Sequence, residues 1–439
     1  MAQNITVIGT GYVGLVSGVG LADFGNTVTG VDIDASKIER LSRGEEVIYE
    51  HGLRDYLHRN IESGRLRFST DIRGSVAGSD IVFIAVGTPE SEDGSADLSY
   101  IGSAIRDIAA SLSGFTVVVT KSTVPVGTNR WIGDEIRAQA PDADFAVVSN
   151  PEFLREGKAV QDFFHPDRLV IGYEEGTEQG KKARELMEDV YRALYLIETP
   201  IVWCSLETAE LIKYASNAFL ATKITFINQM ANLAEACGAD IHAVAKTMGM
   251  DGRISPKFLH PGPGYGGSCF PKDTKAVVST GNRFGVQMSL IEEVIRANER
   301  QKELTADKLK TMLGDPAGKT VAVLGLAFKA ETDDVRDSPA ITMVGMLRSW
   351  GATVQAHDPE AMENFSKLFS EGVTYFESEF EALKDADALV VLTEWNAYRN
   401  LDLKKAHSLM KGRVILDARN ALDPDEARQL GFTYRGVGR

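Results

Sequence analysis

Three features of the sequence predict an α/β fold in which two doubly wound parallel-sheet domains are joined by a long central helix. A β-branched run at residues 4–9 leads into a glycine-rich turn and a helical pattern. A similar run begins again at residue 319, which indicates an internal repeat. Between the two, residues 206–236 contain neither proline nor glycine. A helix of that length would extend roughly 45 Å, so we expect it to connect two domains or to form a subunit interface.

Composition sets further bounds on the fold and on its partners. With 439 residues, of which 44% are hydrophobic and 25% charged, the chain resembles an ordinary globular protein of two or three domains. A net charge of −15 argues against a nucleic-acid partner. Cys204, Cys237 and Cys269 are too widely spaced for a disulfide framework or a metal site, which indicates a reducing, cytoplasmic setting. The uncharged segment 1–22 contains five glycines and follows no basic residue, so we expect neither a signal peptide nor a membrane partner.

The first half of the chain contains a turn suited to a dinucleotide. It reads Gly9-Thr10-Gly11-Tyr12-Val13-Gly14, follows a strand and opens a helix, and a second strand ends at Asp32. In such a Rossmann-like turn the first glycine makes the tight bend, the second admits the pyrophosphate and the third lets helix and strand pack closely. Asp32 can accept hydrogen bonds from the adenosine ribose and would repel a 2′-phosphate, which favours NAD over NADP. Lys37 could reach the same ribose edge.

Three further apolar runs, at residues 80–86, 115–120 and 146–149, predict buried strands of the same sheet. The first run ends in Gly87-Thr88-Pro89, where a doubly wound sheet would present its crevice, and polar residues follow the other two: Lys121-Ser122-Thr123 and Asn150-Pro151-Glu152. Because ligands in open α/β sheets bind beyond the carboxyl ends of the strands, we expect these clusters to face one cleft.

The second half repeats the strand pattern at residues 319–325, 352–358, 386–393 and 413–417. Its first turn reads Gly325-Leu326-Ala327-Phe328-Lys329, without the later glycines. We therefore expect this half to bind a different phosphorylated ligand, for which Lys329, Arg336 and Arg419 are suitable cations.

Between the halves, residues 261–274 are rich in glycine and proline and predict a shaped loop around Cys269, followed by a helical stretch to about Met312. Lys272 lies close in sequence, and an ammonium favours the nucleophilic thiolate. NAD accepts a hydride and a thiolate needs a carbonyl. One substrate satisfies both if an alcohol is first oxidised to an aldehyde, which the cysteine then captures.

Six stretches, in this order, resemble the nucleotide-sugar 6-dehydrogenase family along essentially the whole chain. They are Gly9–Gly14, Lys121–Pro125, Asn150–Gly157, Lys213–Asn217, Gly266–Asp273 and Gly325–Lys329. Three more stretches, Ile48–Glu50, His165–Arg168 and Ser268–Pro271, are similar to the branch that acts on UDP-glucose. His51 stands where that branch usually has proline.

The resemblance implies NAD-dependent four-electron oxidation of UDP-glucose to UDP-glucuronate through a thiohemiacetal and a thioester at Cys269. The same chemistry on GDP-mannose or on a UDP-N-acetylated hexosamine is an alternative. A two-electron dehydrogenase, another alternative, would have no use for Cys269. A non-catalytic nucleotide-sugar-binding protein would not need Cys269, Lys213 and Asp273 together. In this family Arg253 reaches the substrate of the neighbouring subunit, so the resemblance also implies a homodimer.

The resemblance further implies roles for individual residues. Lys213 and Asn217 match the residues that stabilise the oxyanion, Asp273 matches the acid that assists the water or base chemistry, and Thr123 and Glu152 match residues that place or activate water. The remaining cofactor-side matches are Val86, Thr88, Ser122, Glu156, Lys272 and Arg336. The sugar-nucleotide side would also include Phe153, Leu154, Arg253, Phe258, Leu259, Gly264, Tyr265, Gly266, Phe328, Lys329 and Arg419. We expect an NAD-binding domain at residues 1–205, a central dimerisation region at 206–314 and a UDP-sugar-binding domain at 315–439.

Overall fold

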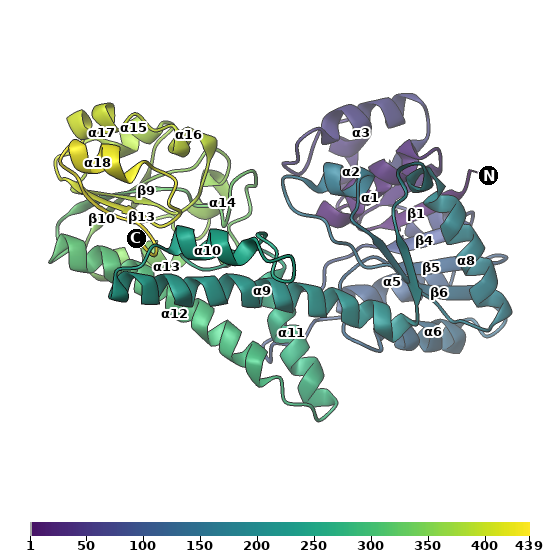
Figure 1. Cartoon of the computed structure of the whole chain (residues 1–439). Helices are drawn as coiled ribbons and strands as arrows, with labels where there is room; N and C mark the ends of the chain where they lie inside the picture. The colour runs from purple at the N-terminus through teal and green to yellow at the C-terminus, as the bar shows by residue number, and fades with distance from the viewer. Residues whose placement is uncertain (1) are drawn as a thin grey trace. The chain divides into compact units, whose positions relative to one another are not determined.

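The computed structural model describes residues 2–439, which fall into two compact units. One unit contains the described residues up to 216 and residues 279–284, and the other contains residues 217–278 and 285–439. The helix α9 (Leu206–Cys237) contributes residues to both units, and Figure 1 shows it as one continuous helix. It ends just before Gly238, which adopts a φ of 77°. The predicted long central helix is therefore confirmed.

The first unit contains an eight-stranded sheet in the order β3-β2-β1-β4-β5-β6-β7-β8. Its strands are β1 (Asn4–Ile8), β2 (Thr27–Val31), β3 (Leu66–Ser69), β4 (Ile81–Ile84), β5 (Thr116–Thr120), β6 (Phe145–Ser149), β7 (Leu169–Gly172) and β8 (Ile201–Cys204). Neighbouring strands are parallel except β6 and β7, which meet antiparallel at Ser149 and Gly172. The order of β3 to β6 confirms the predicted doubly wound sheet, and β7 and β8 extend it beyond the predicted strands.

Helices cover both faces of this sheet, as the alternation of side chains along β1 requires. Ile5 and Val7 enter one apolar core, while Ile8 enters the core on the opposite face. The helices that supply the first core are α1 (Tyr12–Asp23), α2 (Ala35–Ser42), α3 (Leu53–Glu62), α7 (Ala159–Phe164) and α8 (Glu178–Val190), with the 3-10 helix η1 (Arg192–Ile197). Those that supply the second are α4 (Ile72–Val76), α5 (Ser99–Ala109) and α6 (Thr128–Gln139).

The second unit repeats this plan with a six-stranded, all-parallel sheet in the order β11-β10-β9-β12-β13-β14. Its strands are β9 (Thr320–Leu324), β10 (Thr353–His357), β11 (Val373–Tyr375), β12 (Ala388–Val391), β13 (Val414–Asp417) and β14 (Thr433–Arg435). Four of them lie within the runs that the sequence repeat predicted. The second Rossmann-like sheet is therefore confirmed.

The second sheet is also covered on both faces. On one face lie the carboxyl-terminal part of α9 and the helices α10 (Ile241–Gly249), α12 (Ser289–Leu313), α13 (Pro339–Ser349) and α14 (Met362–Ser366). On the other lie α15 (Glu379–Leu383), α16 (Asn396–Arg399), α17 (Leu403–Leu409) and α18 (Pro424–Gln429). Among residues 2–439, no helix combines the length and the apolar character needed to cross a bilayer.

The structure corrects two sequence expectations around Cys269. The predicted loop to Thr274 ends at Cys269, because α11 (Phe270–Arg283) begins at the next residue. Pro271 is the second residue of this helix, where its missing N–H costs no hydrogen bond. The single helical stretch expected up to Met312 was also wrong. It is two helices, α11 and α12, separated at Gly285, which has a φ of 70°.

Candidate active site

The glycine-rich turn after β1 has the geometry that a dinucleotide pyrophosphate requires. Gly9 has a φ of +96°, and a Cβ there would lie 2.7 Å from the carbonyl oxygen of Ala85. A Cβ at Gly14 would lie 1.9 Å from the carbonyl oxygen of Gly9, whereas one at Gly11 would meet nothing within 4 Å. The fold therefore needs the first and third glycines, and Gly11 leaves room for a ligand. Since α1 begins at Tyr12 directly after this glycine, its first N–H groups are available to a phosphate.

Asp32, at the end of β2, is held in place by its neighbours. Its Oδ2 accepts hydrogen bonds from the Thr10 N–H at 3.0 Å, the Thr10 hydroxyl at 2.8 Å and the Lys37 ammonium at 2.9 Å. Burial raises the pKa of Asp32, but the hydrogen bonds from Lys37 and Thr10 outweigh it and hold that pKa below its usual value. The carboxylate is thus ionised and fixed at the turn, with Lys37 bound to it.

The structure brings together the predicted cofactor-side residues that follow β4 and β5. The Thr88 hydroxyl donates to the carbonyl oxygen of Thr123 at 3.0 Å. The Ser122 hydroxyl donates to the carbonyl oxygen of Val86 at 2.6 Å. These four residues form one connected edge at the carboxyl ends of the two strands, as expected for the rim of a ligand cleft.

A buried ion pair joins the segment after β6 to α9. The Lys213 Nζ lies 3.0 Å from Glu152 Oε1, with side-chain exposures of 4% and 6%. The second oxygen of Glu152 accepts the N–H of Leu154, and the Lys213 Nζ lies 5.3 Å from the ring centre of Phe153. Four predicted site residues are therefore neighbours. Removing one partner of such a pair typically costs about 3–5 kcal/mol, because it leaves a buried charge uncompensated.

In the second unit, Asp273 is the centre of a hydrogen-bonded cluster on α11. Its Oδ2 accepts from Asn217 Nδ2 at 2.6 Å and its Oδ1 from Lys272 Nζ at 2.7 Å, while only 1% of Asp273 is exposed. The structure places Lys272, which the resemblance assigned to the cofactor side, against this carboxylate. Asn217 and Asp273, which the sequence separates by more than fifty residues, are in direct contact.

Cys269 is half-buried and lies at the start of α11. Its carbonyl oxygen accepts the N–H of Asp273 at 2.8 Å, the first hydrogen bond of that helix. The Ser268 hydroxyl oxygen lies 3.5 Å from its sulfur. A helix N-terminus favours negative charge, so this position suits a thiolate independently of any single lysine.

Side-chain amides from α9 and α12 fix the shape of the cysteine loop. Asn228 accepts the N–H of Gly262 at 2.8 Å, and Gln301 donates to the Gly262 carbonyl at 3.0 Å. Asn298 accepts the N–H of Tyr265 at 2.8 Å and donates to its carbonyl at 3.0 Å. Sequence reasoning missed these three amides, since polar residues in a helical pattern give no signal of a distant loop. The loop is therefore held before any ligand arrives.

The turn after β9 packs against the same loop. Gly267 has a φ of +85°, and a Cβ there would lie 2.7 Å from the Phe328 ring. The Gly267 N–H donates to the carbonyl oxygen of Arg336 at 2.7 Å. Arg419 donates to the carbonyl oxygens of Phe328 and Leu392 at 2.7 and 2.8 Å. Predicted substrate-side residues from three distant stretches thus meet within this unit.

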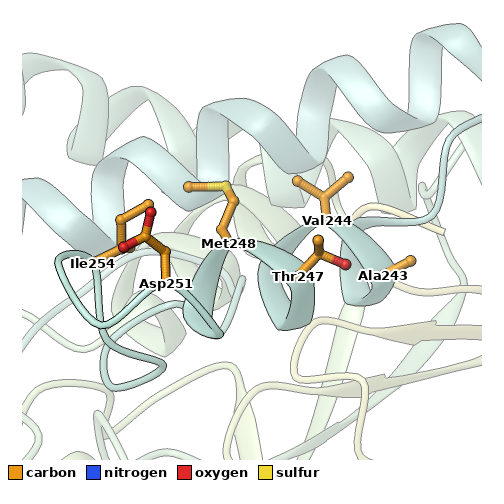
Figure 2. Close-up of a pocket in the computed structure, with 6 residues that line it drawn as sticks. All are labelled: Ala243, Val244, Thr247, Met248, Asp251 and Ile254. Carbon is orange, nitrogen blue, oxygen red and sulfur yellow. The ribbon is translucent and has the colours of Figure 1, made fainter.

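Other predicted residues lie at more exposed positions. The Arg253 and Arg336 side chains are 90% and 65% exposed and pair with Asp251 at 2.6 Å and Asp334 at 2.8 Å. The Lys329 Nζ lies 5.6 Å from the ring centre of Phe328. A hollow of about 580 Å³ lies on α10 and the segment after it, close in sequence to Arg253. It is lined by Ala243, Val244, Thr247, Met248, Asp251 and Ile254. Figure 2 shows the side chains that line it.

Two buried residues to which the resemblance assigned no individual role complete the first unit's site. Glu50 Oε2 accepts the hydroxyl of Tyr12 and the N–H of Gly157. Burial and the Glu50 carboxylate raise the pKa of Tyr12 well above its usual value. Lys121, at the end of β5, is 4% exposed. Both belong to stretches that carry the family resemblance, but a sequence alone does not distinguish a buried charge from a solvated one.

Two sheets of the doubly wound type, the first with a dinucleotide turn and an acidic residue at the end of its second strand, are typical of NAD-dependent oxidoreductases. Models of one family match three successive parts of the chain. They are the NAD binding domain at residues 3–195, the central domain at 207–300 and the UDP binding domain at 322–424. The chain belongs to the UDP-glucose/GDP-mannose dehydrogenase family.

Relatives cover the whole chain. It is 53% identical to a UDP-glucose 6-dehydrogenase of Rhizobium meliloti, with 100% of both proteins covered. It is 45% identical to the UDP-glucose 6-dehydrogenase TuaD of Bacillus subtilis, with coverage of 100% and 93%. Among solved structures, a UDP-glucose dehydrogenase of Pyrobaculum islandicum matches with a TM-score of 0.92 and 40% identity over 100% and 98% of the two chains. A UDP-D-ManNAc dehydrogenase of Pyrococcus horikoshii matches with a TM-score of 0.87 and 29% identity over 99% of each.

Proposed function

We propose that this enzyme oxidises the C6 hydroxymethyl group of UDP-glucose to a carboxylate, giving UDP-glucuronate with two NAD⁺ reduced. The observation that carries the proposal is Cys269 at the head of α11, because a dehydrogenase that stops at an aldehyde or a ketone needs no thiol. The choice of substrate rests on relatives at 53% and 45% identity that bear the name UDP-glucose 6-dehydrogenase.

The turn Gly9–Gly14 and Asp32 would hold the coenzyme, with Val86, Thr88, Ser122 and Thr123 along its rim. Space beside Gly11 and the exposed start of α1 fit a pyrophosphate. The bound NAD⁺ would accept a hydride in each of two oxidations. We extend the cofactor-side assignment to Tyr12, Val13, Lys37, Glu156, Lys272 and Arg336.

Cys269 would act after the alcohol has become an aldehyde. Its thiolate attacks C6, a sulfur–carbon bond forms, and the carbonyl electron pair moves to oxygen as the thiohemiacetal forms. Lys213 and Asn217, one turn apart on α9, would stabilise that oxygen. Departure of a hydride from C6 leaves a thioester.

Water then attacks the thioester carbon, the sulfur–carbon bond breaks and the thiolate leaves. Asp273, Thr123 and Glu152 would orient this water and receive its proton. In total, one alcohol and one water give a carboxylate, two hydrides and three protons, so electrons and atoms balance.

The sugar nucleotide would bind to the second unit, mainly to the proposed UDP-sugar-binding domain at residues 315–439. Cations at Lys329 and Arg419 suit a diphosphate, and the rigid loop that contains Leu259, Gly264, Tyr265 and Gly266 suits the sugar. We also assign Phe153, Leu154, Phe258 and Phe328 to the substrate side. The boundaries 1–205, 206–314 and 315–439 are proposed as the functional division of the chain.

A homodimer through the central region, in a cytoplasmic setting, is part of the proposal. Large apolar side chains are exposed along α9 at Leu211, Phe219, Phe226 and Leu233, whose exposures range from 43% to 64%. Their spacing of seven or eight residues keeps them on one helix face, which suits a second helix. Arg253, with a 90% exposed side chain, is available to a neighbouring subunit.

The test is to count NADH formed per sugar with the purified enzyme. We expect two per UDP-glucose, with UDP-glucuronate as the product. One NADH per sugar would instead indicate a two-electron dehydrogenase. A parallel panel of GDP-mannose and UDP-N-acetylated hexosamines tests the alternative substrates, which are included because a relative at 29% identity is named a UDP-D-ManNAc dehydrogenase. A higher kcat/KM for any of these would overturn the choice of UDP-glucose.

A further inference from the structure

Lys121 is a buried cation at the carboxyl end of β5 for which the mechanism above has no role. Only 4% of the residue is exposed. Its backbone N–H donates to the carbonyl oxygen of Ile84 at 2.9 Å, which continues the pairing of β4 and β5 beyond their ends. An ammonium without water is costly unless nearby groups compensate its charge. The groups around Lys121 should therefore explain why a charged side chain is buried at this position.

Asn150 is the hydrogen-bond partner of this ammonium, and the two side chains are part of one buried network. The Lys121 Nζ donates to Asn150 Oδ1 at 3.1 Å, and the Tyr191 hydroxyl donates to the same oxygen at 2.6 Å. Asn150 Nδ2 donates to the carbonyl oxygen of Val170 at 2.9 Å. The amide thus connects the end of β5 and the end of α8 to strand β7. Since Glu152 follows two residues later, this network sets where the Glu152 segment begins.

The charged groups that act on Lys121 are the members of the buried ion pair. Burial lowers the pKa of Lys121 to about 8, the Glu152 carboxylate raises it, and the Lys213 ammonium lowers it. Tyr191 contributes its ring face, 5.9 Å from the Lys121 Nζ. The Lys121 ammonium, bound to Asn150, and the Lys213 ammonium, bound to Glu152, are therefore both buried and repel each other, which is an arrangement that stability alone does not favour.

We propose that Lys121 is a positioning residue of the oxidation, whose ammonium fixes Asn150 and balances the Glu152–Lys213 pair so that Lys213 stays available to an oxyanion. Without this second cation, Glu152 would hold Lys213 more tightly and its segment would lose an anchor. The inference rests on the proposed function, because Lys121 acts only through residues to which that function assigns catalytic roles.

The role predicts an unusual combination of effects for Lys121→Met. We expect kcat to fall by about 10-fold or more, while KM for UDP-glucose changes by less than about twofold, because Lys121 belongs to the first unit and the sugar nucleotide is proposed to bind to the second. We also expect an unchanged or higher Tm. Below its depressed pKa the Lys121 ammonium is charged, and this buried charge destabilises the folded protein. Replacing it with the uncharged methionine side chain should therefore not lower Tm.

The experiment begins with the wild-type enzyme, since failure to form two NADH per UDP-glucose would refute the proposed function rather than this inference. Lys121→Met is then compared with Lys181→Met, a matched control at a lysine whose side chain is 63% exposed on α8. Wild-type kcat should decline as the pH rises through about 8, and Lys121→Arg, which keeps its charge, should lose that decline.

Three results would overturn the inference. They are a kcat for Lys121→Met within about twofold of wild type, a Lys121→Arg pH profile identical to that of wild type, and a loss of folding in both Lys121→Met and Lys121→Gln. The last result would make the lysine purely structural. A fall in kcat with Tm retained would support the positioning role.

Discussion

The two sheets begin in the same way and diverge after the first glycine of each. Gly9 and Gly325 have φ angles of +96° and +99°, and a Cβ at either would collide with the segment after the fourth strand of its sheet. After Gly9 a helix begins at Tyr12, whereas after Gly325 the next helix begins at Pro339. The first turn therefore presents a helix N-terminus, and the second presents a loop that packs on the cysteine loop.

The acidic residues at the ends of the second strands show the same divergence. Asp358 accepts the N–H of Leu326 at 2.7 Å, as Asp32 accepts that of Thr10 at 3.0 Å. Asp358 also accepts from Ala327, Trp395, Glu360 and Ala361 and is 0% exposed, while the Asp32 side chain is 11% exposed. The comparison teaches that the strand framework is shared and that the residues after the first glycine decide which ligand is bound.

The loop held by the second turn ends at Cys269, and replacement of its thiol should have the largest effect of the changes considered. We expect Cys269→Ser to reduce UDP-glucuronate formation by on the order of 10³-fold or more, because a neutral hydroxyl is a far weaker nucleophile than a thiolate. NAD binding should be nearly unchanged. Product analysis and a titration with NAD⁺ measure the two effects, and Cys237→Ser is the control at an exposed cysteine. Full activity in Cys269→Ser would refute the thioester route.

Substitutions of the glycines after Gly9 should disrupt the first turn without changing the turn after Gly325. Gly14→Ala would place a Cβ against the carbonyl oxygen of Gly9, and we expect a loss of about 1–3 kcal/mol of stability together with weaker NAD binding. Gly11→Ala should weaken NAD binding on the order of 10-fold without lowering Tm, because its Cβ enters open space.

Thermal melts and NAD⁺ titrations distinguish the two variants. Equal melting temperatures for Gly14→Ala and Gly11→Ala would contradict the packing role of the third glycine.

Lys329 tests the second turn. Removal of its cation in Lys329→Ala should raise KM for UDP-glucose by about 10-fold while kcat changes little, because a phosphate contact is made equally in the ground and transition states. Steady-state kinetics at saturating NAD⁺ measure this. Lys367→Ala, at an exposed lysine on the same unit, is the control. An unchanged KM with a lowered kcat would contradict the assignment.

The smallest expected effect concerns Asp32. Asp32→Asn should narrow the preference for NAD⁺ over NADP⁺ by a few-fold, because it removes the repulsion of a 2′-phosphate. The depressed pKa means that the ionised carboxylate stabilises the fold above the unfolded-state pKa and that this contribution is lost as the pH falls through the folded value. Asp32→Asn should therefore lose less stability than wild type on acidification below about pH 4. Parallel acid titrations of the two proteins would reveal a difference, and superimposable curves would contradict it.

Much of the fold was predictable because its central strands are continuous apolar runs. β4, for example, is buried at every position, and such a run gives a clear signal in the sequence. β8 gave none, since its residues are half-buried or exposed. The antiparallel meeting of β6 and β7 depends on tertiary packing, which no local pattern encodes. The end of the cysteine loop was misplaced because proline was interpreted as a helix breaker at a position where a helix accepts it.

For the site, the residues were predictable and their partners were not. The glycine turn with Asp32 follows from local rules, and Cys269 from its unusual surroundings. The contact between Asn217 and Asp273, and the three amides that hold the loop, join residues distant in sequence. Lys121 lies in one of the stretches that carry the family resemblance, but only its burial makes it notable.

Glu50 connects the first turn of α1 to the segment that follows β6. The same carboxylate receives the hydroxyl of Tyr12, in the first turn of α1, and the amide of Gly157, at the far end of the segment that contains Glu152. Neither piece can shift without breaking a bond to Glu50. Coenzyme loading should therefore slow deuterium uptake at the Gly157 amide, although the nucleotide itself need not touch that residue.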